Sequence, residues 1–307
     1  MYDAAVGCAE ALDPQSLRLT THAFRMNYTT LISVADLAKH LGNEELVIFD
    51  CRHELTNPEF GPKAYAESHV PGARFAHVGR DLAGPPTGKN GRHPLPDPNA
   101  FIAWLGRMGV SNGSQVVGYD HAGGTYASRL WWMLRWVGHQ KVAVADGGWQ
   151  AWTAAGQPVT KELPAQTPAK FSGKPDRSWV DAATVAERLK SKGMVLIDAR
   201  SNDRFQGRNE TIDPVAGHIP GALNRFFKDN LNAQGHFRSP EELRADFKSL
   251  VGDASPEKVV HQCGSGVSAC HNLLAMEIAG IKGTRLYPGS WSEWITDPSR
   301  PVATGSA

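Results

Sequence analysis

Short, nearly continuous apolar runs alternate with longer stretches of helical periodicity along the chain. The run "LVIFD" (46–50) is typical of a strand that is covered on both faces. The stretch "PNAFIAWLGRMG" (98–109) places apolar residues three and four apart and ends in glycine, which predicts a helix. The same reasoning predicts helices over 30–45 and 125–138 and strands over 114–120 and 141–146. This alternation predicts an α/β fold, with mostly parallel sheets that carry helices on both faces.

The pattern repeats once, at a period of about 148 residues. Four segments of the first half return in the same order in the second half: "LVIFDCR" as "VLIDAR", "HVPGARF" as "HIPGALN", "SQVVGYD" as "EKVVHQC" and "GGWQAW" as "GSWSEW". A period of this length is too long for a solenoid and fits two fused globular domains. The sequence therefore predicts two tandem domains of the same fold.

The domain boundaries follow from changes in composition. Residues 1–25 match no regular pattern, so we predict a poorly packed N-terminal extension there. The first domain is predicted over 26–158 and the second over 179–307. Between them, residues 159–178 are rich in Pro, Ala, Lys and Gly and lack periodicity, which predicts an interdomain linker.

Composition and charge argue against several classes of function. The 307 residues carry 32 basic and 31 acidic side chains, a formal net charge of +1, so the chain has no electrostatic footprint for nucleic acid. No apolar run reaches the roughly 20 residues that a membrane span needs, and the N-terminus lacks the layout of a secretory signal. Four cysteines are too few for a disulfide framework, which favours a reducing, cytoplasmic compartment. Twelve histidines without clustered spacing predict no metal site, and no cofactor is expected.

One cysteine stands at the mouth of a glycine-rich turn. In "VVHQCGSGVSACHNLLA" (259–275), Cys263 follows a predicted strand and precedes a predicted helix. Ligands of open α/β sheets sit beyond the carboxyl ends of strands. Gly264 and Gly266 allow a tight curl whose N–H groups face inward, and the following helix adds its positive end. Both effects stabilise a thiolate and would equally stabilise a persulfide, so Cys263 is predicted to be a nucleophile.

Three kinds of function use a cysteine in such a loop. In cysteine phosphatases, the sixth residue after the cysteine is an arginine that clamps the phosphate. That position is Ala269 in this chain, so the loop lacks the clamp. A small anionic sulfur group suits the turn better, which favours sulfur transfer. A non-enzymatic module that binds a partner is the third kind, and the retained cysteine argues against it.

Three motifs resemble those of a known family. "CGSGVSAC", the paired "HVPGA" and "HIPGA" turns and "YPGSWSEW" are similar to motifs of the tandem-domain rhodanese sulfurtransferases, and the similarity runs from about Thr30 to Val302. The loop after Cys263 resembles that of the members that use 3-mercaptopyruvate, whereas the thiosulfate-preferring members have basic residues there. The resemblance implies two rhodanese domains with only the second catalytic, since Asp120 stands in the first half where Cys263 stands in the second.

The resemblance also implies a mechanism in two steps. The Cys263 thiolate takes the sulfur of 3-mercaptopyruvate and becomes a persulfide. Backbone N–H groups of the loop would hold this persulfide, namely those of Gly264, Gly266, Val267 and Ser268. An acceptor thiol such as thioredoxin or glutathione, or cyanide, then takes the outer sulfur. Thiosulfate as the donor is the alternative within the family.

Further site residues are implied by the same resemblance. Arg204 matches an arginine that binds the carboxylate of the donor. Arg208 is the nearest candidate for a second such arginine, although the "PEP" stretch that precedes it in the family is absent here. Ser265, His93 and Asp81 are the candidates for a Ser–His–Asp relay, which requires that they lie within hydrogen-bond reach of one another.

Overall fold

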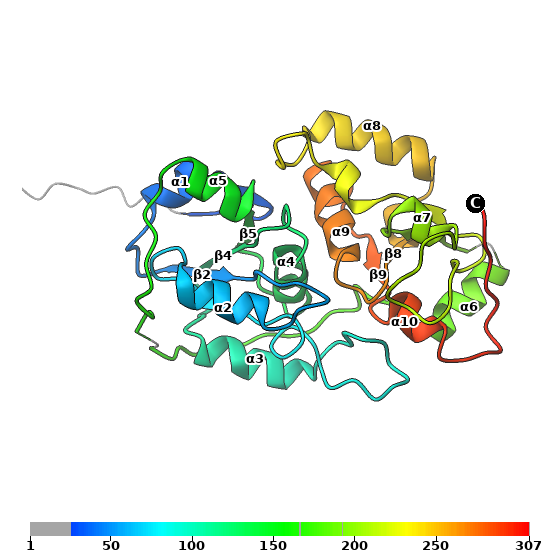
Figure 1. Cartoon of the computed structure of the whole chain (residues 1–307), viewed down its shortest axis with the longest axis horizontal. Coiled ribbons are helices and arrows are strands. Elements are labelled where there is room, and N and C mark those ends of the chain that lie inside the picture. Colours follow the sequence, from blue (N-terminus) through cyan, green and yellow to red (C-terminus); the bar gives the residue numbers. More distant parts are fainter. Residues whose placement is uncertain (1–25, 166, 192, 307) are drawn as a thin grey trace, which may run out of the picture.

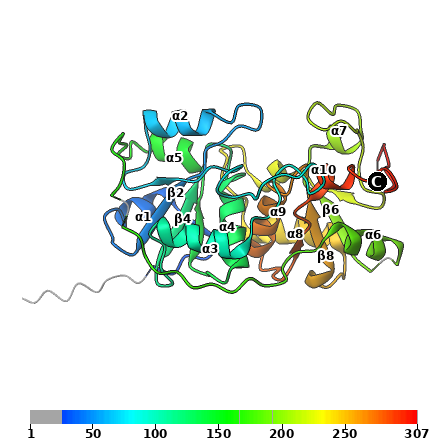
Figure 2. The same cartoon turned by 90° about the horizontal axis from the view of Figure 1, so that it is seen from below.

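Each half of the chain folds around its own parallel β-sheet, and the two halves lie side by side (Figure 1). The computed structural model describes residues 26–165, 167–191 and 193–306, so the extension predicted over 1–25 lies outside the described residues. Figure 2 shows the same arrangement from below, with helices α4 (Ala127–Trp136) and α9 (Ala269–Ile278) where the halves meet. The predicted α/β fold with parallel sheets is confirmed.

The first domain has a five-stranded sheet in which all neighbouring strands are parallel. Its strands in spatial order are β1 (Leu31–Ile32), β5 (Val142–Ala145), β4 (Gln115–Tyr119), β2 (Leu46–Asp50) and β3 (Arg74–Phe75). Side chains alternate across each strand. Phe49 packs in the cluster that includes α3 (Pro98–Arg107) and α4, whereas Ile48 packs with α1 (Val34–Lys39) and α5 (Gly148–Ala154). Helices therefore cover both faces.

The second domain repeats this layout with four parallel strands. In spatial order they are β7 (Leu223–Asn224), β6 (Val195–Asp198), β8 (Val259–Gln262) and β9 (Arg285–Leu286). Helices α8 (Pro240–Val251) and α9 pack on one face, and α6 (Ala182–Lys190) and α10 (Ser290–Trp294) pack on the other. One apolar cluster continues from α4 into α9. This shared core sets the position of the two sheets relative to each other.

The stretch 30–45, predicted as one helix, is divided in the structure. Leu31 and Ile32 form β1 at the edge of the sheet beside β5, and α1 begins only at Val34. Ser33 caps this helix, because its Oγ accepts the N–H of Asp36 at 3.0 Å. The sequence analysis did not anticipate the short elements α2 (Phe60–Glu67), α7 (Asn202–Phe205), η1 (Phe227–Asn230) and η2 (Pro256–Lys258).

The segment between the domains runs along the first domain before it reaches the second. Residues 155–181 contain no helix and no strand, with residue 166 outside the description, and the predicted linker 159–178 lies within them. Asp176 N donates to Trp136 O at 3.0 Å, which holds the segment against the first domain. Val180 N then donates to Leu286 O at 2.8 Å, beside β9. The connection is therefore hydrogen-bonded to both domains.

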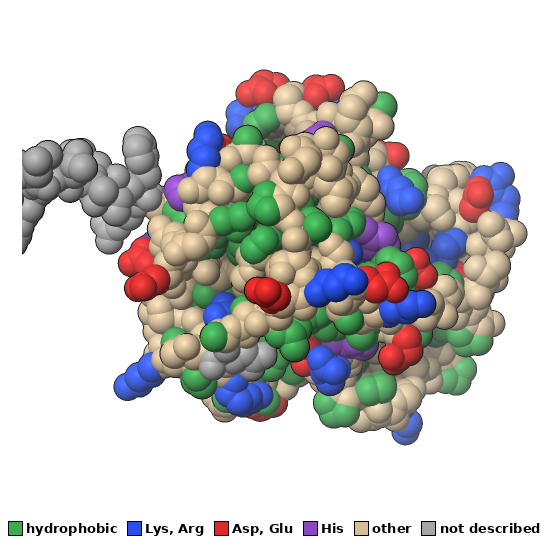
Figure 3. Space-filling view, turned by 60° about the vertical axis from the view of Figure 1, so that its left-hand side comes forward, with side chains coloured by type: hydrophobic (Ala, Val, Ile, Leu, Met, Phe, Trp, Pro, Cys, Tyr) green, Lys and Arg blue, Asp and Glu red, His purple; other side chains and the backbone are tan. Residues whose placement is uncertain are grey.

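The surface mixes charges of both signs. On the face shown in Figure 3, acidic and basic side chains are interspersed, in keeping with the formal net charge of +1. Among the described residues, no helix combines the length and the apolar character that a membrane crossing demands.

Candidate active site

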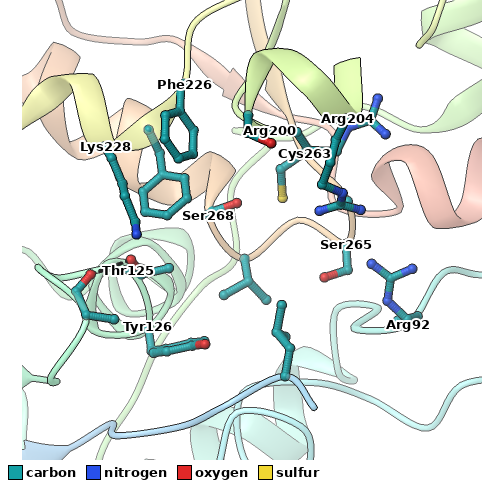
Figure 4. Close-up of a pocket in the computed structure, with 16 residues that line it drawn as sticks. Arg92, Thr125, Tyr126, Arg200, Arg204, Phe226, Lys228, Cys263, Ser265 and Ser268 are labelled. Atoms are coloured by element: carbon teal, nitrogen blue, oxygen red, sulfur yellow. Dashed lines mark hydrogen bonds between the residues drawn. The ribbon is translucent and has the colours of Figure 1, made fainter. Parts of the chain in front are cut away.

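Cys263 lies at the carboxyl end of β8, immediately before the loop that leads into α9 (Figure 4). The residue is only 1% exposed and lines a pocket of about 340 Å³ between the two domains. The N–H of Gly266 donates a hydrogen bond to Cys263 Sγ at 3.1 Å. An amide donor stabilises the thiolate form of sulfur. The loop can therefore hold a nucleophilic cysteine.

Two glycines make the tight course of this loop possible. Gly266 has a φ of +77°, and a Cβ there would lie 2.2 Å from the carbonyl oxygen of Pro288. A Cβ on Gly264 would lie 2.9 Å from Nη2 of Arg92. We call the N–H groups of residues 264–268 the second cradle. Within the described residues no protein acceptor takes a hydrogen bond from the N–H groups of Gly264, Ser265, Val267 and Ser268.

We call the N–H groups of the corresponding loop in the first domain, residues 121–127, the first cradle. The side chain of the preceding residue fills this cradle. Asp120 follows β4 as Cys263 follows β8, and its carboxylate accepts four backbone N–H bonds. The donors are Ala122 at 2.7 Å, Gly124 at 2.9 Å, Tyr126 at 2.7 Å and Ala127 at 2.8 Å. The first cradle therefore binds an internal anion and carries no nucleophile.

Two arginines flank the second cradle, one from each domain. Arg204, on α7, donates to Glu210 at 3.0 Å and to Asp213 at 2.9 Å. Arg92, from the loop before α3, pairs with the other carboxylate oxygen of Asp213 and lies against Gly264. Both line the pocket, and Figure 4 shows them on the same side of Cys263. Two guanidinium groups at one end of a pocket suit a carboxylate or another small anion.

Only one of these arginines, Arg204, was predicted from the sequence. Arg208, predicted as the second, does not line the pocket, because its side chain is 62% exposed and pairs with Asp203 at 3.2 Å. The stretch that follows Arg208 instead supplies the carboxylates that hold Arg92 and Arg204. The position of Arg92 directly before His93 was the sequence signal for it.

The serine and the histidine of the predicted relay meet in the structure. Ser265 Oγ and His93 Nδ1 lie 2.8 Å apart, although the two residues come from different domains. Burial lowers the pKa of His93 to about 3, and the nearby Arg129 and Arg92 act in the same direction. His93 is therefore neutral near pH 7, so it can orient the Ser265 hydroxyl without adding charge.

Asp81, predicted as the third member of the relay, is held elsewhere. Its carboxylate accepts the N–H of His77 at 2.8 Å and a hydrogen bond from Arg80 at 2.9 Å. Among the described residues, no hydrogen bond joins Asp81 to His93. The structure thus assembles a Ser–His pair, because Asp81 closes its own turn and pairs with the neighbouring arginine.

Known proteins show where this arrangement belongs. The model of the rhodanese-like domain matches the chain twice, over residues 33–155 and 181–297. The chain belongs to the rhodanese family. It is 47% identical over 283 residues to "Probable 3-mercaptopyruvate sulfurtransferase" of Pseudomonas aeruginosa, across 91% of this chain and 100% of that protein. It is 38% identical to thiosulfate sulfurtransferase of Cricetulus griseus, across 91% of this chain and 97% of the relative.

Solved rhodanese structures have the same fold. The 3-mercaptopyruvate sulfurtransferase from Leishmania major matches with a TM-score of 0.77 at 32% identity, over 87% of this chain and 74% of that one. SseA from Escherichia coli matches with a TM-score of 0.75 at 28% identity, over 86% of this chain and 99% of that one. Its structure is described with the rhodanese fold of 3-mercaptopyruvate sulfotransferases. The predictions of two rhodanese domains and of a sulfurtransferase are confirmed. A sulfurtransferase acts on a small sulfur donor and an acceptor.

The pocket of this rhodanese extends past Cys263, away from the two arginines. Figure 4 shows this other end between the two domains. It is lined by Thr125, Tyr126, Phe226 and Lys228. None of these residues was among the predicted site residues, because only folding brings η1 of the second domain next to the start of α4.

A buried arginine connects the domains behind the second cradle. Arg129, on α4, is fully buried and donates to the carbonyl oxygens of Gly266 at 3.1 Å and of His93 and Leu82 at 3.2 Å. Burial lowers the pKa of Arg129, and no carboxylate in the described part of the chain pairs with it. Its positive charge lies next to the loop that carries Cys263. A cation in a low-dielectric site favours an anion beside it.

Proposed function

We propose that this rhodanese transfers a sulfur atom from 3-mercaptopyruvate to a thiol or to cyanide, through a persulfide on Cys263. The observation that carries the proposal is an unfilled cradle around Cys263 with two arginines beside it. The donor presents a carboxylate, a carbonyl group and a sulfur. Arg92 and Arg204 match the carboxylate, and the Ser265 hydroxyl matches the carbonyl oxygen.

In the first step, the Cys263 thiolate attacks the sulfur of the donor. An S–S bond forms, the C–S bond of the donor breaks, and its electron pair leaves with carbon as the enolate of pyruvate, which takes up a proton. The Ser265 hydroxyl, oriented by neutral His93, donates a hydrogen bond to the enolate oxygen as its charge develops. The resulting persulfide is held by the N–H groups of Gly264, Gly266, Val267 and Ser268.

In the second step, the acceptor attacks the outer sulfur of the persulfide. The S–S bond breaks, its electron pair returns to Cys263 as a thiolate, and the acceptor leaves as a persulfide, or as thiocyanate in the case of cyanide. The proposed acceptors are cyanide and thiols, and the size of the pocket favours glutathione over a protein thiol such as thioredoxin. The cytoplasm is the proposed compartment, because Cys51, Cys263 and Cys270 are free thiols.

Thiosulfate is the second candidate donor, because the thiosulfate sulfurtransferase of Cricetulus griseus is 38% identical to this chain. The two arginines would attract its negative charge as well as that of a carboxylate. Thiosulfate has no carbonyl group, so the hydrogen-bonded pair of Ser265 and His93 would have no enolate to stabilise. This pair is the feature that favours 3-mercaptopyruvate.

A kinetic comparison of the two donors tests the proposal. We expect a higher kcat/KM with 3-mercaptopyruvate, and Ser265→Ala should lower that value about tenfold or more by removing a donor to the enolate. Mass spectrometry after incubation with the donor should find one added sulfur on Cys263, about 32 Da. A higher kcat/KM with thiosulfate, or the absence of an adduct with both donors, would contradict the proposal.

A further inference from the structure

The two ends of the pocket differ in how their cations are paired. At one end, each arginine is tied to a carboxylate: Arg92 and Arg204 share Asp213, and Arg200 pairs with Asp198 at 2.7 Å. At the other end, Lys228 is exposed and forms no hydrogen bond or ion pair with any described residue. Among the cationic side chains that line the pocket, Lys228 is therefore the one that no carboxylate of the described residues pairs with.

Apolar and aromatic side chains border the approach to Lys228. Phe226 and Phe227 precede it in the chain, and Thr125 and Tyr126 lie opposite, on the first domain. Figure 4 shows the amino group of Lys228 directed toward Thr125, across the pocket from the two arginines. Apolar walls with one cation fit a short carbon chain that ends in an anionic group.

We propose that this end of the pocket, between Lys228 and Tyr126, binds the sulfur acceptor and selects small thiols that carry a carboxylate. The inference rests on the proposed function, because it concerns the second step of the reaction. The thiolate of the acceptor attacks the outer sulfur of the persulfide, the S–S bond breaks toward Cys263, and the acceptor leaves as its own persulfide. The carboxylate of the acceptor pairs with Lys228, so the arginine end remains for the donor.

The depth and size of the pocket favour a small acceptor. Cys263 is 1% exposed, so a small thiol can approach it more closely than a thiol on the surface of a folded protein. The volume of about 340 Å³ is near the lower end of the roughly 300–1,000 Å³ that small-molecule sites span. A small thiol enters such a pocket whole and brings its charged group with it.

The test uses three thiols that share a two-CH2 spacer between the sulfur and the terminal group and differ in charge. They are 3-mercaptopropionate (negative), 2-mercaptoethanol (neutral) and cysteamine (positive). Enzyme loaded with sulfur and freed of excess donor is mixed with each thiol, and the loss of the persulfide is followed at equal thiolate concentrations. We expect the negative thiol to react fastest and the positive thiol slowest. The ratio of these two rates should fall about fivefold in Lys228→Met and about 25-fold in Lys228→Glu.

The matched control is Lys282→Met, which removes the same charge from an exposed lysine outside the pocket. This variant should keep the wild-type ratio. An unchanged ratio in both Lys228 variants, an equal fall in Lys282→Met, or a protein thiol that reacts faster than every small thiol would overturn the proposal.

A second readout needs no sulfur donor. Iodoacetate and iodoacetamide alkylate the Cys263 thiolate and differ in charge, so the ratio of their rates reports the field in the pocket. This ratio should also fall about fivefold in Lys228→Met. Failure to form a persulfide, with alkylation ratios as expected, would count against the proposed function and leave the field of Lys228 established. An alkylation ratio that Lys228→Met leaves unchanged would count against the acceptor site.

Discussion

The two cradles differ in what fills them. In the first, the Asp120 carboxylate accepts four backbone N–H bonds, so the acceptor is supplied from within the domain. In the second, Cys263 Sγ receives one such bond, from Gly266, and the other N–H groups stay open to a ligand. An open set of donors can stabilise charge that appears during a reaction, whereas a filled one cannot. The residue type at the end of one strand therefore separates a domain whose cradle is filled from one whose cradle can serve the proposed reaction.

A second difference lies behind each cradle, at the start of α5 and α10. Gly148 has a φ of +55°, and Ser290, at the matching position, has a φ of +54°. No other non-glycine residue among those described has a positive φ. The Ser290 hydroxyl accepts the N–H of Cys263 at 3.1 Å and donates to the carbonyl of Tyr287 at 2.9 Å. The second domain thus keeps a strained serine where the first domain has glycine, and this serine holds the peptide N–H of Cys263.

Replacing the residue that precedes each cradle, Asp120 or Cys263, should give the largest effects. The first replacement should mainly lower stability, and the second should mainly lower activity. Asp120→Ala leaves four N–H groups without their acceptor, and each unsatisfied buried group costs about 1–3 kcal/mol. We expect the free energy of unfolding in urea to fall by about 3 kcal/mol or more. Cys263→Ser should abolish sulfur transfer and lower the free energy of unfolding by less than about 1 kcal/mol. Equal losses of stability in the two variants would show that the cradles do not differ as described.

A buried histidine in the strand that leads into the second cradle should make the stability of the protein depend on pH. Strand β8 carries His261 where β4 carries Gly118. The ring of His261 is fully buried, and its Nε2 lies 3.0 Å from Met276 Sδ. Burial lowers the pKa of His261 to about 3. The unfolded chain takes up this proton near pH 6.5, so stability is lost as the pH falls from about 6.5 toward 3.

His261→Leu should remove that part of the acid sensitivity. We expect the difference between the free energies of unfolding at pH 7 and pH 5 to be smaller by about 2 kcal/mol in the variant. Urea titrations of both proteins at the two pH values give this difference. The same pH dependence in variant and wild type would mean that His261 is not a group that titrates on unfolding.

Substitutions of Ser290 should give the smallest effects. Glycine relieves a backbone strain of about 1–2 kcal/mol, alanine keeps it, and both remove the hydroxyl that holds the N–H of Cys263. We expect Ser290→Gly to be more stable than Ser290→Ala by about 1 kcal/mol. Both variants should form the persulfide about tenfold more slowly, as measured by rapid mixing with the donor. A wild-type rate in Ser290→Gly would show that the hydroxyl only fills space.

Much of the fold could be predicted because its signals are local. The apolar run at 46–50 is β2, and the periodic stretch at 98–109 contains α3. The prediction for 30–45 failed because Leu31 and Ile32 take their structure from β5, a strand far away in the chain. Periodicity describes one face of one element. It does not report which residues complete the edge of a sheet.

The site divides in the same way. Cys263 and its glycines are neighbours in the chain, so the sequence revealed the loop and the type of chemistry. Arg92 was missed because its approach to Cys263 depends on how the domains pack, and Lys228 was missed because the fold of the second domain brings η1 beside the pocket. Arg208 was predicted as the second arginine because it is close to Arg204 along the chain, but its side chain pairs with Asp203.

The sequence by itself determined the repeat, the glycine-rich loop around Cys263 and the lack of a phosphate clamp at Ala269, since each depends on residues that are close in the chain or on segments that recur in the same order. Only the tertiary structure decided that Arg92 accompanies Arg204, that His93 meets Ser265 and that Lys228 stands alone at the other end of the pocket. The contacts of Arg92 and His93 join the two domains, which also meet where α4 packs on α9. The relative position of the two sheets follows from close packing of that shared core, which no local pattern of apolar residues encodes.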